Sequence, residues 1–380
     1  MKSLKVFRIF GIDIKLHYSW WIVFVLLAWI LTTNFFPAFF PEQTSQQYWL
    51  MGILASLLLF VSVLLHELAH ALVAKSRKIK VESITLFFFG GVAGITSEDM
   101  KPSSEFLMAI AGPIFSIVLA ALFFLLFKLD GNITLTAISF YLYQLNFILA
   151  IFNLIPGYPL DGGRAFRAIL YWHYKDLKKA TLIASKGGKI FAGVLIILGI
   201  LGMISGQGSG IWFILLGGFI YFIAGTSYEQ VVIKEVLDKV KVKELLQKKI
   251  PTVKGKMNLN QLVEKYKDTE HTVFLVKGKG FKGILDTKAI DKASLRMQKM
   301  MKLQDLALSL SSVKSIQDDE NCYKAFVKLA KEKYTLLPVK KGKKHIGFIG
   351  QKVLMHHLVW ELKFGHLAKR KKLKKVKKGK

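Results

Sequence analysis

The chain has 380 residues, of which 52% are hydrophobic, and its formal net charge is +30. The single cysteine, Cys322, excludes an intramolecular disulfide and any zinc cluster built from cysteines. Much of the positive charge stands at the ends of apolar runs and in the last residues, KRKKLKKVKKGK from Lys369. This tail has no interleaved aromatic residue, so we expect no nucleic-acid partner; it is either attracted to an anionic membrane surface or simply solvated.

Apolar runs near the length that spans a bilayer recur through the first 228 residues and are absent afterwards. We therefore expect a polytopic α-helical membrane domain at 1–228, a soluble α/β domain at 229–360 and a basic tail at 361–380. The expected spans are 17–36, 49–74, 104–127, 133–156, 189–205 and 210–226, of which the last two are short and interrupted by glycine.

The distribution of basic residues predicts the orientation of these spans. Lys2, Lys5, Arg8 and Lys15 precede the first span, whereas the loop after it, PAFFPEQTSQQ, has no positive charge. Positively charged loops stay on the cytoplasmic side of a membrane. The later loops alternate in the same way, which predicts a multi-pass protein of the cell membrane with both termini in the cytoplasm.

The second expected span carries ionisable residues in the pentapeptide HELAH. His66 and His70 are four residues apart, so on a helix they share a face and can bind one ion. H-E-x-x-H is the zinc metalloprotease pattern, in which the glutamate, here Glu67, is the general base. An ionisable residue at the bilayer centre costs about 2.5–3.5 kcal/mol on insertion scales and is usually functional. The alternative is a histidine pair that lines a water-filled vestibule or bonds a neighbouring helix.

Between the second and third spans lies ESITLFFFGGVAGITSED, which is apolar but too short to cross a membrane. Its backbone polar groups must pair with protein if the segment enters lipid. We therefore expect a membrane-associated β-hairpin that turns near Gly90 and Gly91, with an interfacial loop as the alternative.

A third metal ligand is expected where the fourth span ends, in FNLIPGYPLDGGRAFRAIL. Pro156 and Pro159 prevent a continuous helix. Asp161 follows at the predicted cytoplasmic end, at the depth of the two histidines, and a catalytic zinc needs a third protein ligand. Asp-Gly-Gly after proline is also a plain turn signal, which is the alternative for this position.

The last third of the chain contains two similar segments, HTVFLVKGKGFKGILDTKAI from His271 and YTLLPVKKGKKHIGFIGQKVLMHHL from Tyr334. Each shows strand, basic turn, Gly-centred strand and helix, and each follows a helix. This repeat resembles a pair of CBS motifs, which often bind adenine nucleotides between the repeats. The acidic residue that usually contacts ribose occurs only as Asp286, because Gln351 and Lys352 stand there in the second repeat. Nucleotide binding and a scaffold or dimerisation role therefore remain equal alternatives.

Four motifs of the first 228 residues resemble those of the site-2 protease family, the intramembrane zinc metalloproteases of peptidase family M50. They are HELAH, GGV at Gly90–Val92, AGP at Ala111–Pro113, and NLIPGYPLDGGR from Asn153 to Arg164. The likeness is greatest to the archaeal and bacterial branch, in which a six-span core is followed by a pair of CBS domains.

The resemblance implies a protease that cleaves transmembrane helices of membrane proteins near the cytoplasmic face, as in regulated intramembrane proteolysis. It implies that Glu67 is the catalytic base, that Asn153 contacts the substrate near the scissile bond, and that the hairpin at Gly90 and Gly91 pairs with an unwound substrate. The implied ligands of one Zn²⁺ per chain are His66, His70 and Asp161.

Two other functions fit parts of the sequence. A transporter or channel with a CBS regulatory domain and an intramembrane metal site predicts further ionisable residues along several spans, and most of the spans carry no charge. A catalytically idle protein that binds transmembrane helices would not need an intact HELAH and Asp161. We therefore expect an intramembrane zinc metalloprotease.

Overall fold

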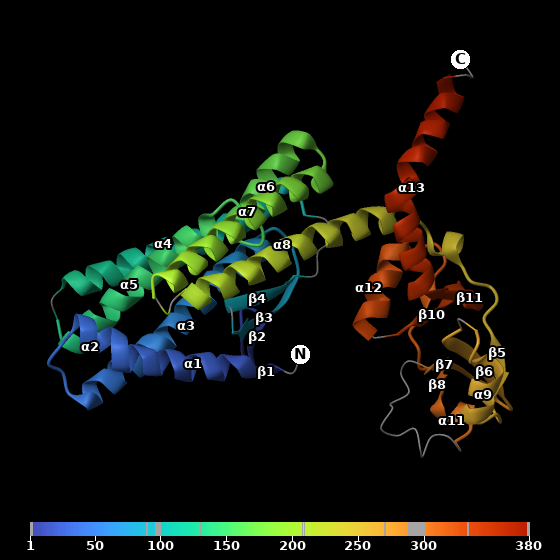
Figure 1. Cartoon of the computed structure of the whole chain (residues 1–380), viewed down its shortest axis with the longest axis horizontal. Helices are drawn as coiled ribbons and strands as arrows, with labels where there is room; N and C mark the ends of the chain where they lie inside the picture. The colour runs from blue at the N-terminus through green and yellow to red at the C-terminus, as the bar shows by residue number, and fades with distance from the viewer. Residues whose placement is uncertain are drawn as a thin grey trace. The chain divides into compact units, whose positions relative to one another are not determined.

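The structure is a computed structural model that divides into two compact units, Met1–Val231 and Val232–Lys380 (Figure 1). The boundary falls inside helix α8 (Gly210–Asp238). The structure describes residues 3–88, 90–95, 100–129, 131–206, 208, 210–269, 271–287, 301–332 and 334–377, without the side chains of 92, 93, 95 and 365–377.

The first unit contains six helical segments that are long and apolar enough to cross a membrane, among the described residues. This number confirms the six predicted spans. The first segment, Tyr18–Phe39, joins α1 (Tyr18–Ile30), a π-helical stretch (Leu31–Phe35) and α2 (Phe36–Phe39). The others are α3 (Ser45–Ser76), α4 (Pro102–Lys128), α5 (Ile133–Leu154), α7 (Leu177–Ile204) and α8.

The helices that contain the predicted fifth and sixth spans extend beyond the predicted apolar runs. Helix α7 begins at Leu177 rather than at residue 189, with Asp176 as its N-cap accepting a hydrogen bond from Lys179 N at 2.9 Å. Helix α8 continues to Asp238 rather than ending at residue 226. Lysine and glutamate are good helix formers, so a helix continues where the apolar run stops, whereas hydropathy marks only the apolar part.

A four-stranded sheet accompanies the helices, in the order β1 (Ser3–Ile9), β2 (Ile12–His17), β3 (Val81–Phe87) and β4 (Gly90–Ile95). The antiparallel hairpin β3–β4 is the one that the sequence predicted. Strands β1 and β2 were not predicted. Strand β2 pairs in parallel with β3, with Asp13 opposite Ser83, and a pairing over so many intervening residues has no local sequence signal. Among the described residues, β1 and β4 are the edge strands of this sheet.

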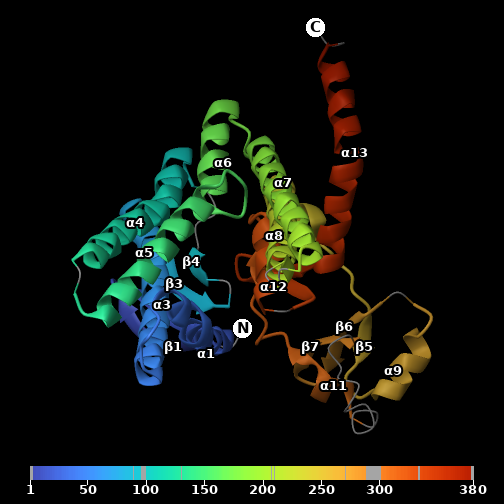
Figure 2. The ribbon, with the colours of Figure 1, turned by 60° about the vertical axis from the view of Figure 1, so that its left-hand side comes forward.

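The alternative of a plain turn at Asp161 is wrong, because Asp161, Gly162 and Gly163 form the first turn of a helix, α6 (Asp161–Tyr174). The loop before it crosses α7 closely, because Tyr158 N donates to Ala184 O at 3.0 Å. A Cβ added at Gly188 would lie 1.8 Å from Tyr158 O, so only glycine allows this approach. Helix α4 packs against α3, α5 and α6, and Figure 2 shows it beside α5 and α6.

The second unit contains two copies of a strand–helix–hairpin arrangement. The first copy is β5 (Thr252–Lys254), α9 (Leu259–Tyr266), β6 (Val273–Gly278) and β7 (Phe281–Asp286), and the second is β9 (Ile316–Gln317), α12 (Cys322–Glu332), β10 (Leu336–Lys341) and β11 (Lys344–Gly350). In both copies the short first strand is parallel to the first strand of the hairpin. The predicted pair of CBS motifs is therefore confirmed by its internal symmetry.

Shorter elements complete the second unit. They are a 3₁₀ turn (Val242–Leu245), α11 (Leu303–Leu306), β8 (Leu308–Ser309) and α13 (Gln351–Lys377). Helix α13 continues through most of the predicted basic tail. The helix expected after the hairpin of the first copy falls at 288–300, outside the described residues.

Candidate metal and active site

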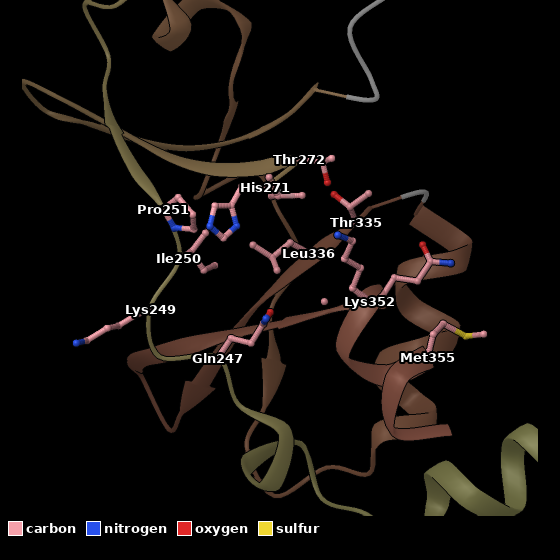
Figure 3. A pocket seen from close by; sticks show the side chains of 13 residues that line it. Gln247, Lys249, Ile250, Pro251, His271, Thr272, Thr335, Leu336, Lys352 and Met355 are labelled. Carbon is pink, nitrogen blue, oxygen red and sulfur yellow. The ribbon is translucent and has the colours of Figure 1, made fainter. Parts of the chain in front are cut away.

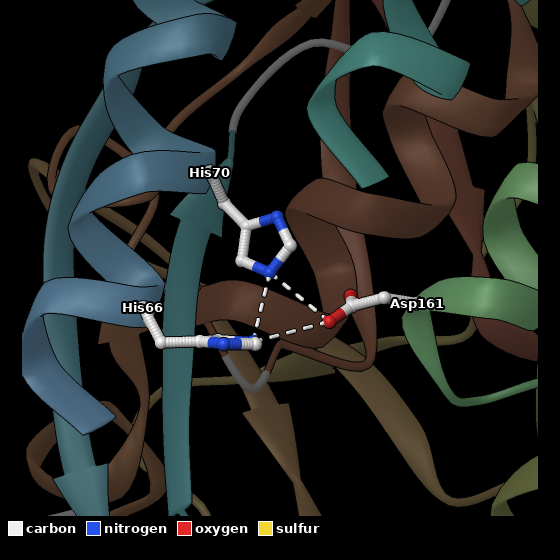
Figure 4. A group of neighbouring side chains, drawn as sticks. All are labelled: His66, His70 and Asp161. Carbon is white, nitrogen blue, oxygen red and sulfur yellow. Dashed lines mark hydrogen bonds and ion pairs between the residues drawn. The ribbon is translucent and has the colours of Figure 1, made fainter. Parts of the chain in front are cut away.

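Helices α3 and α6 bring together the three residues that the sequence singled out as metal ligands (Figure 4). Asp161 Oδ2 lies 3.3 Å from His66 Nε2 and 3.0 Å from His70 Nε2, and the two Nε2 atoms are 3.2 Å apart. Both imidazoles are buried, with 3% of His66 and 5% of His70 exposed. Two histidines of α3 and an aspartate 91 and 95 positions further along the chain thus place three ligand atoms close together.

The other ring nitrogen of each histidine has a fixed partner on α4. His70 Nδ1 lies 2.6 Å from Met108 O, and because a carbonyl only accepts, Nδ1 carries the proton and donates it. His66 Nδ1 lies 2.8 Å from Ser116 Oγ, to which it can donate in the same way. This tautomer leaves the lone pair of each Nε2 directed toward Asp161, as a metal ligand requires.

The residues fit a zinc ion. Ligand atoms at about 2.0–2.1 Å from a tetrahedral zinc are separated by about 3.3–3.4 Å, close to the three separations observed. Two nitrogen lone pairs and a carboxylate oxygen that face one another repel unless a cation lies between them. Space is kept there by Gly112, since a Cβ on it would lie 2.1 Å from His70 Nε2 and 2.7 Å from His66 Nε2.

Asp161 offers a carboxylate, which is a common ligand of zinc. Burial raises the pKa of this carboxyl, whereas the positive charge of Arg164 lowers it. The ionised carboxylate can bind a cation directly.

Glu67 follows His66 on α3 and lies against the edge strand of the sheet. A Cβ added at Gly91 of β4 would lie 2.3 Å from Glu67 Cγ and 3.0 Å from Glu67 Oε1. The glutamate side chain and the backbone of β4 are therefore in direct contact. Gly90, the first residue of β4, has φ +126°, a conformation that favours glycine.

Asn153 lies near the end of α5, eight residues before Asp161. Its Nδ2 donates to Leu149 O at 3.0 Å, within its own helix. Its described hydrogen bond therefore joins it to α5 and not to the three clustered residues.

Sequence reasoning missed several residues that support the cluster. Ser116 and the Met108 carbonyl orient the histidines. The loop before Asp161 packs directly against Gly187 and Gly188. A serine in an apolar helix and a carbonyl group give no specific signal. The pair of glycines stands just before the predicted fifth span, 189–205, and was given no role in the sequence analysis.

Known proteins resemble this chain over most of its length. The family profile described as Peptidase family M50 matches residues 54–136 and 130–195. Rip3 of Mycobacterium tuberculosis is 31% identical over 326 residues, which are 84% of this chain and 83% of Rip3. Its name describes it as a candidate zinc metalloprotease. The chain belongs to peptidase family M50, the site-2 protease family.

Two further comparisons matched Methanocaldococcus jannaschii. A zinc metalloprotease of that organism is 34% identical over 245 residues, 64% of this chain and 66% of the relative. The solved structure titled as a site-2 protease from the same organism shares 33% identity and a TM-score of 0.41, and covers 59% of this chain and 94% of its own.

As a site-2 protease family member, the chain is a zinc metalloprotease with several membrane spans. This membership decides against the transporter alternative. The described part of the spans agrees, because its buried histidine, acidic and basic side chains are His66, His70 and Glu105, and Glu105 pairs with Arg167 of the helix that begins with Asp161. A transport pathway would need such groups at several depths.

Proposed function

We propose that this protein hydrolyses a peptide bond in a transmembrane segment of membrane-protein substrates, near the cytoplasmic face, with one zinc ion held by His66, His70 and Asp161. The convergence of these three ligand atoms beside Glu67 and an open strand edge carries the proposal. Bound zinc polarises the scissile carbonyl and makes water nucleophilic at neutral pH.

Glu67 is the proposed general base. It accepts a proton from the attacking water and returns it to the leaving amine, a contribution of about 10²- to 10⁴-fold in rate. Its position one residue after His66 keeps it beside the ligands, and its contact with Gly91 keeps it beside the strand edge. A peptide bond held on that edge therefore reaches the base and the metal together.

The edge of β4 is the proposed substrate-binding surface. A transmembrane helix hides its carbonyl groups in internal hydrogen bonds, and a locally unwound stretch must find new partners because lipid offers none. Added beside β4 through Gly90 and Gly91, the unwound stretch gains backbone hydrogen bonds by strand addition. The proposed contact of Asn153 with the substrate exchanges its bond to Leu149 O for one to the substrate.

The proposed cytoplasmic position of the site follows from the charges around it. Lys75, Arg77, Lys78 and Lys80 stand at the end of α3, shortly after His70, and Lys175 follows α6. Basic loops face the cytoplasm. Because α3 carries the histidines in its last three turns, the ligands lie near that side of the membrane.

Zinc content and cleavage measured together test the proposal. Full-length protein in proteoliposomes with a model transmembrane substrate is expected to hold about one zinc per chain and to cleave. Glu67→Gln is expected to keep the zinc and lose at least about 100-fold in rate, whereas Glu82→Gln, an exposed glutamate of β3, keeps both. Unchanged cleavage by Glu67→Gln, or wild type without zinc, contradicts the proposal.

We also propose that the second unit binds an adenine nucleotide between its two copies. A cavity of about 480 Å³ is lined from both of them, with Ile250 and His271 on one side and Thr335, Lys352 and Met355 on the other (Figure 3). Basic side chains suit the phosphates of a nucleotide. Among the described residues that line the cavity there is no carboxylate to bind ribose, and Asp286 is not one of them.

Thermal unfolding of the full-length protein with ATP, ADP or AMP tests this second proposal. Binding raises the midpoint of unfolding of the second unit, and His271→Ala is expected to weaken the effect. His356→Ala, an exposed histidine of α13 outside the cavity, serves as the matched control. The scaffold role is favoured if no nucleotide shifts the midpoint at millimolar concentration.

A further inference from the structure

One face of α4 contacts both clustered histidines and also Arg167, on the helix that begins with Asp161. Glu105, Met108, Gly112 and Ser116 are separated by three, four and four positions. At about 100° per residue, these positions fall within an arc of about 80°. All four residues are buried, with 2% or less of Glu105, Met108 and Ser116 exposed.

We propose that this face of α4 positions the three metal ligands, and that Glu105 acts on Asp161 through Arg167. The proposal rests on the zinc site proposed above. Ser116 orients His66, Met108 O orients His70, and Gly112 leaves the volume in which their nitrogens meet. Glu105 and Arg167 add the third connection, to the helix that begins with Asp161.

Glu105 and Arg167 form a buried ion pair between α4 and α6. Arg167 Nε donates to Glu105 Oε1 at 2.9 Å, and Arg167 Nη2 donates to the same oxygen. The side chain of Glu105 is 3% exposed and that of Arg167 is 12% exposed. The guanidinium carbon also lies 5.0 Å from the centre of the Tyr158 ring, in the loop immediately before Asp161. One arginine therefore connects α4 with both segments that flank the ligand.

The Glu105–Arg167 pair contributes to the orientation of α6 more than to the stability of the fold. The free energy lost when two charges leave water is only partly offset by their mutual attraction, so a buried ion pair is weak evidence for a more stable fold. It does fix orientation, because a guanidinium donates in set directions. Helix α6 has only 14 residues, and Asp161 is the first of them, so a small rotation of the helix moves the carboxylate away from the histidines.

Partners of metal ligands are typically worth about 10- to 100-fold in metal affinity. We therefore expect Glu105→Gln, Arg167→Gln and Ser116→Ala each to weaken zinc binding by about that factor, and Arg167→Lys to weaken it less. Zinc affinity is measured on full-length protein in detergent by competition with a chelating indicator. The visible spectrum of bound Co²⁺ reports the coordination geometry without any need for proteolysis.

Two matched controls separate positioning from general damage. Ser139 Oγ is buried and has no hydrogen-bond partner among the described residues, so Ser139→Ala makes the same change at equal burial away from the site. Glu235→Gln breaks the exposed Glu235–Lys239 pair, which has a separation of 2.7 Å. Both variants are expected to keep wild-type zinc affinity and the wild-type Co²⁺ spectrum.

The double variant Glu105→Gln/Arg167→Gln guards against a folding defect in the single variants. Removing both charges together avoids a buried unpaired charge and is often neutral for stability. Positioning predicts that the folded double variant still binds zinc more weakly, with an altered Co²⁺ spectrum. Suppose that wild type holds zinc and cleaves. If the double variant and Ser116→Ala then show the wild-type zinc affinity and Co²⁺ spectrum, this inference is overturned but the proposed function stands. Wild type that binds no zinc would overturn the proposed function as well.

Discussion

Gly91 and Glu67 are in such close contact that a single methyl group cannot be placed between them, since a Cβ on Gly91 would lie 2.3 Å from Glu67 Cγ. The strand edge proposed to hold the substrate and the residue proposed to move the proton therefore share one surface. In the proposed mechanism this contact couples substrate binding to proton transfer, because a strand that pairs with β4 lies beside the carboxylate.

Gly91→Ala is expected to displace the Glu67 side chain, and so to lower the rate of cleavage by at least about 10-fold while zinc stays bound, since misplacement of a catalytic group by 1 Å costs up to about 100-fold. Gly94→Ala is the matched control on the same strand. A Cβ there lies 3.2 Å from Ser83 Oγ, a hydroxyl that can rotate away. Equal rates for the two variants would show that the contact with Glu67 does not matter.

Gly112→Ala is expected to abolish zinc binding, because the added Cβ lies 2.1 Å from His70 Nε2 in the volume where the ligand atoms meet. Gly218→Ala on α8 provides the comparison, since a Cβ there meets nothing within 4 Å. Alanine is favoured over glycine in a helix by up to about 1 kcal/mol, so this control should fold at least as well as wild type. Zinc content of the purified proteins distinguishes the two, and full zinc content in Gly112→Ala would refute the assignment of this volume to the metal.

Gly188→Ala is expected to displace the loop before Asp161, since its Cβ would lie 1.8 Å from Tyr158 O. The displaced loop moves the carboxylate, so we expect zinc affinity to fall by about 10- to 100-fold. Gly193→Ala, one and a half turns further along α7, meets no atom within 4 Å and should bind zinc as wild type does. Competition with a chelating indicator measures both affinities, and an unchanged value for Gly188→Ala would mean that the loop adapts without moving Asp161.

Cys322 is expected to resist thiol reagents in the folded protein. It is fully buried, and burial raises the pKa of its thiol to about 12, so almost no thiolate exists between pH 7 and 9. Maleimide should modify it only after the second unit unfolds in denaturant. Fast modification of the native protein at pH 8 would show that the core around Cys322 opens readily.

The same protection allows a topology measurement without removal of the native cysteine. A cysteine introduced by Gln46→Cys, just before α3 becomes apolar, should react with an impermeant maleimide from outside intact cells. A cysteine introduced by His173→Cys, at the exposed end of α6, should react only after the membrane is opened. The reverse pattern would invert the proposed orientation and would place the metal site at the outer face.

The spans and the ionisable pentapeptide could be recognised from local sequence. Helix formation within lipid depends on a run of apolar residues of sufficient length. His66 and His70 are about one helical turn apart, with Glu67 between them, so their spacing alone puts them together. The two copies in the second unit were equally visible, because each consists of short segments that alternate or turn at glycine.

Other features depended on contacts between distant segments. The pairing of Asp13 with Ser83, the arrival of Asp161 beside α3, and the Glu105–Arg167 pair join residues far apart in the chain. The periodicity of the sequence does not indicate such contacts. They form only when the segments pack so closely that a side chain at Gly112, Gly157 or Gly188 would clash with its neighbours. The sequence by itself determined which residues could bind a metal and cross a membrane. Only the tertiary structure decided which of these residues lie close together. The ligand atoms converge at a place where the lack of glycine side chains allows neighbouring segments to pack closely.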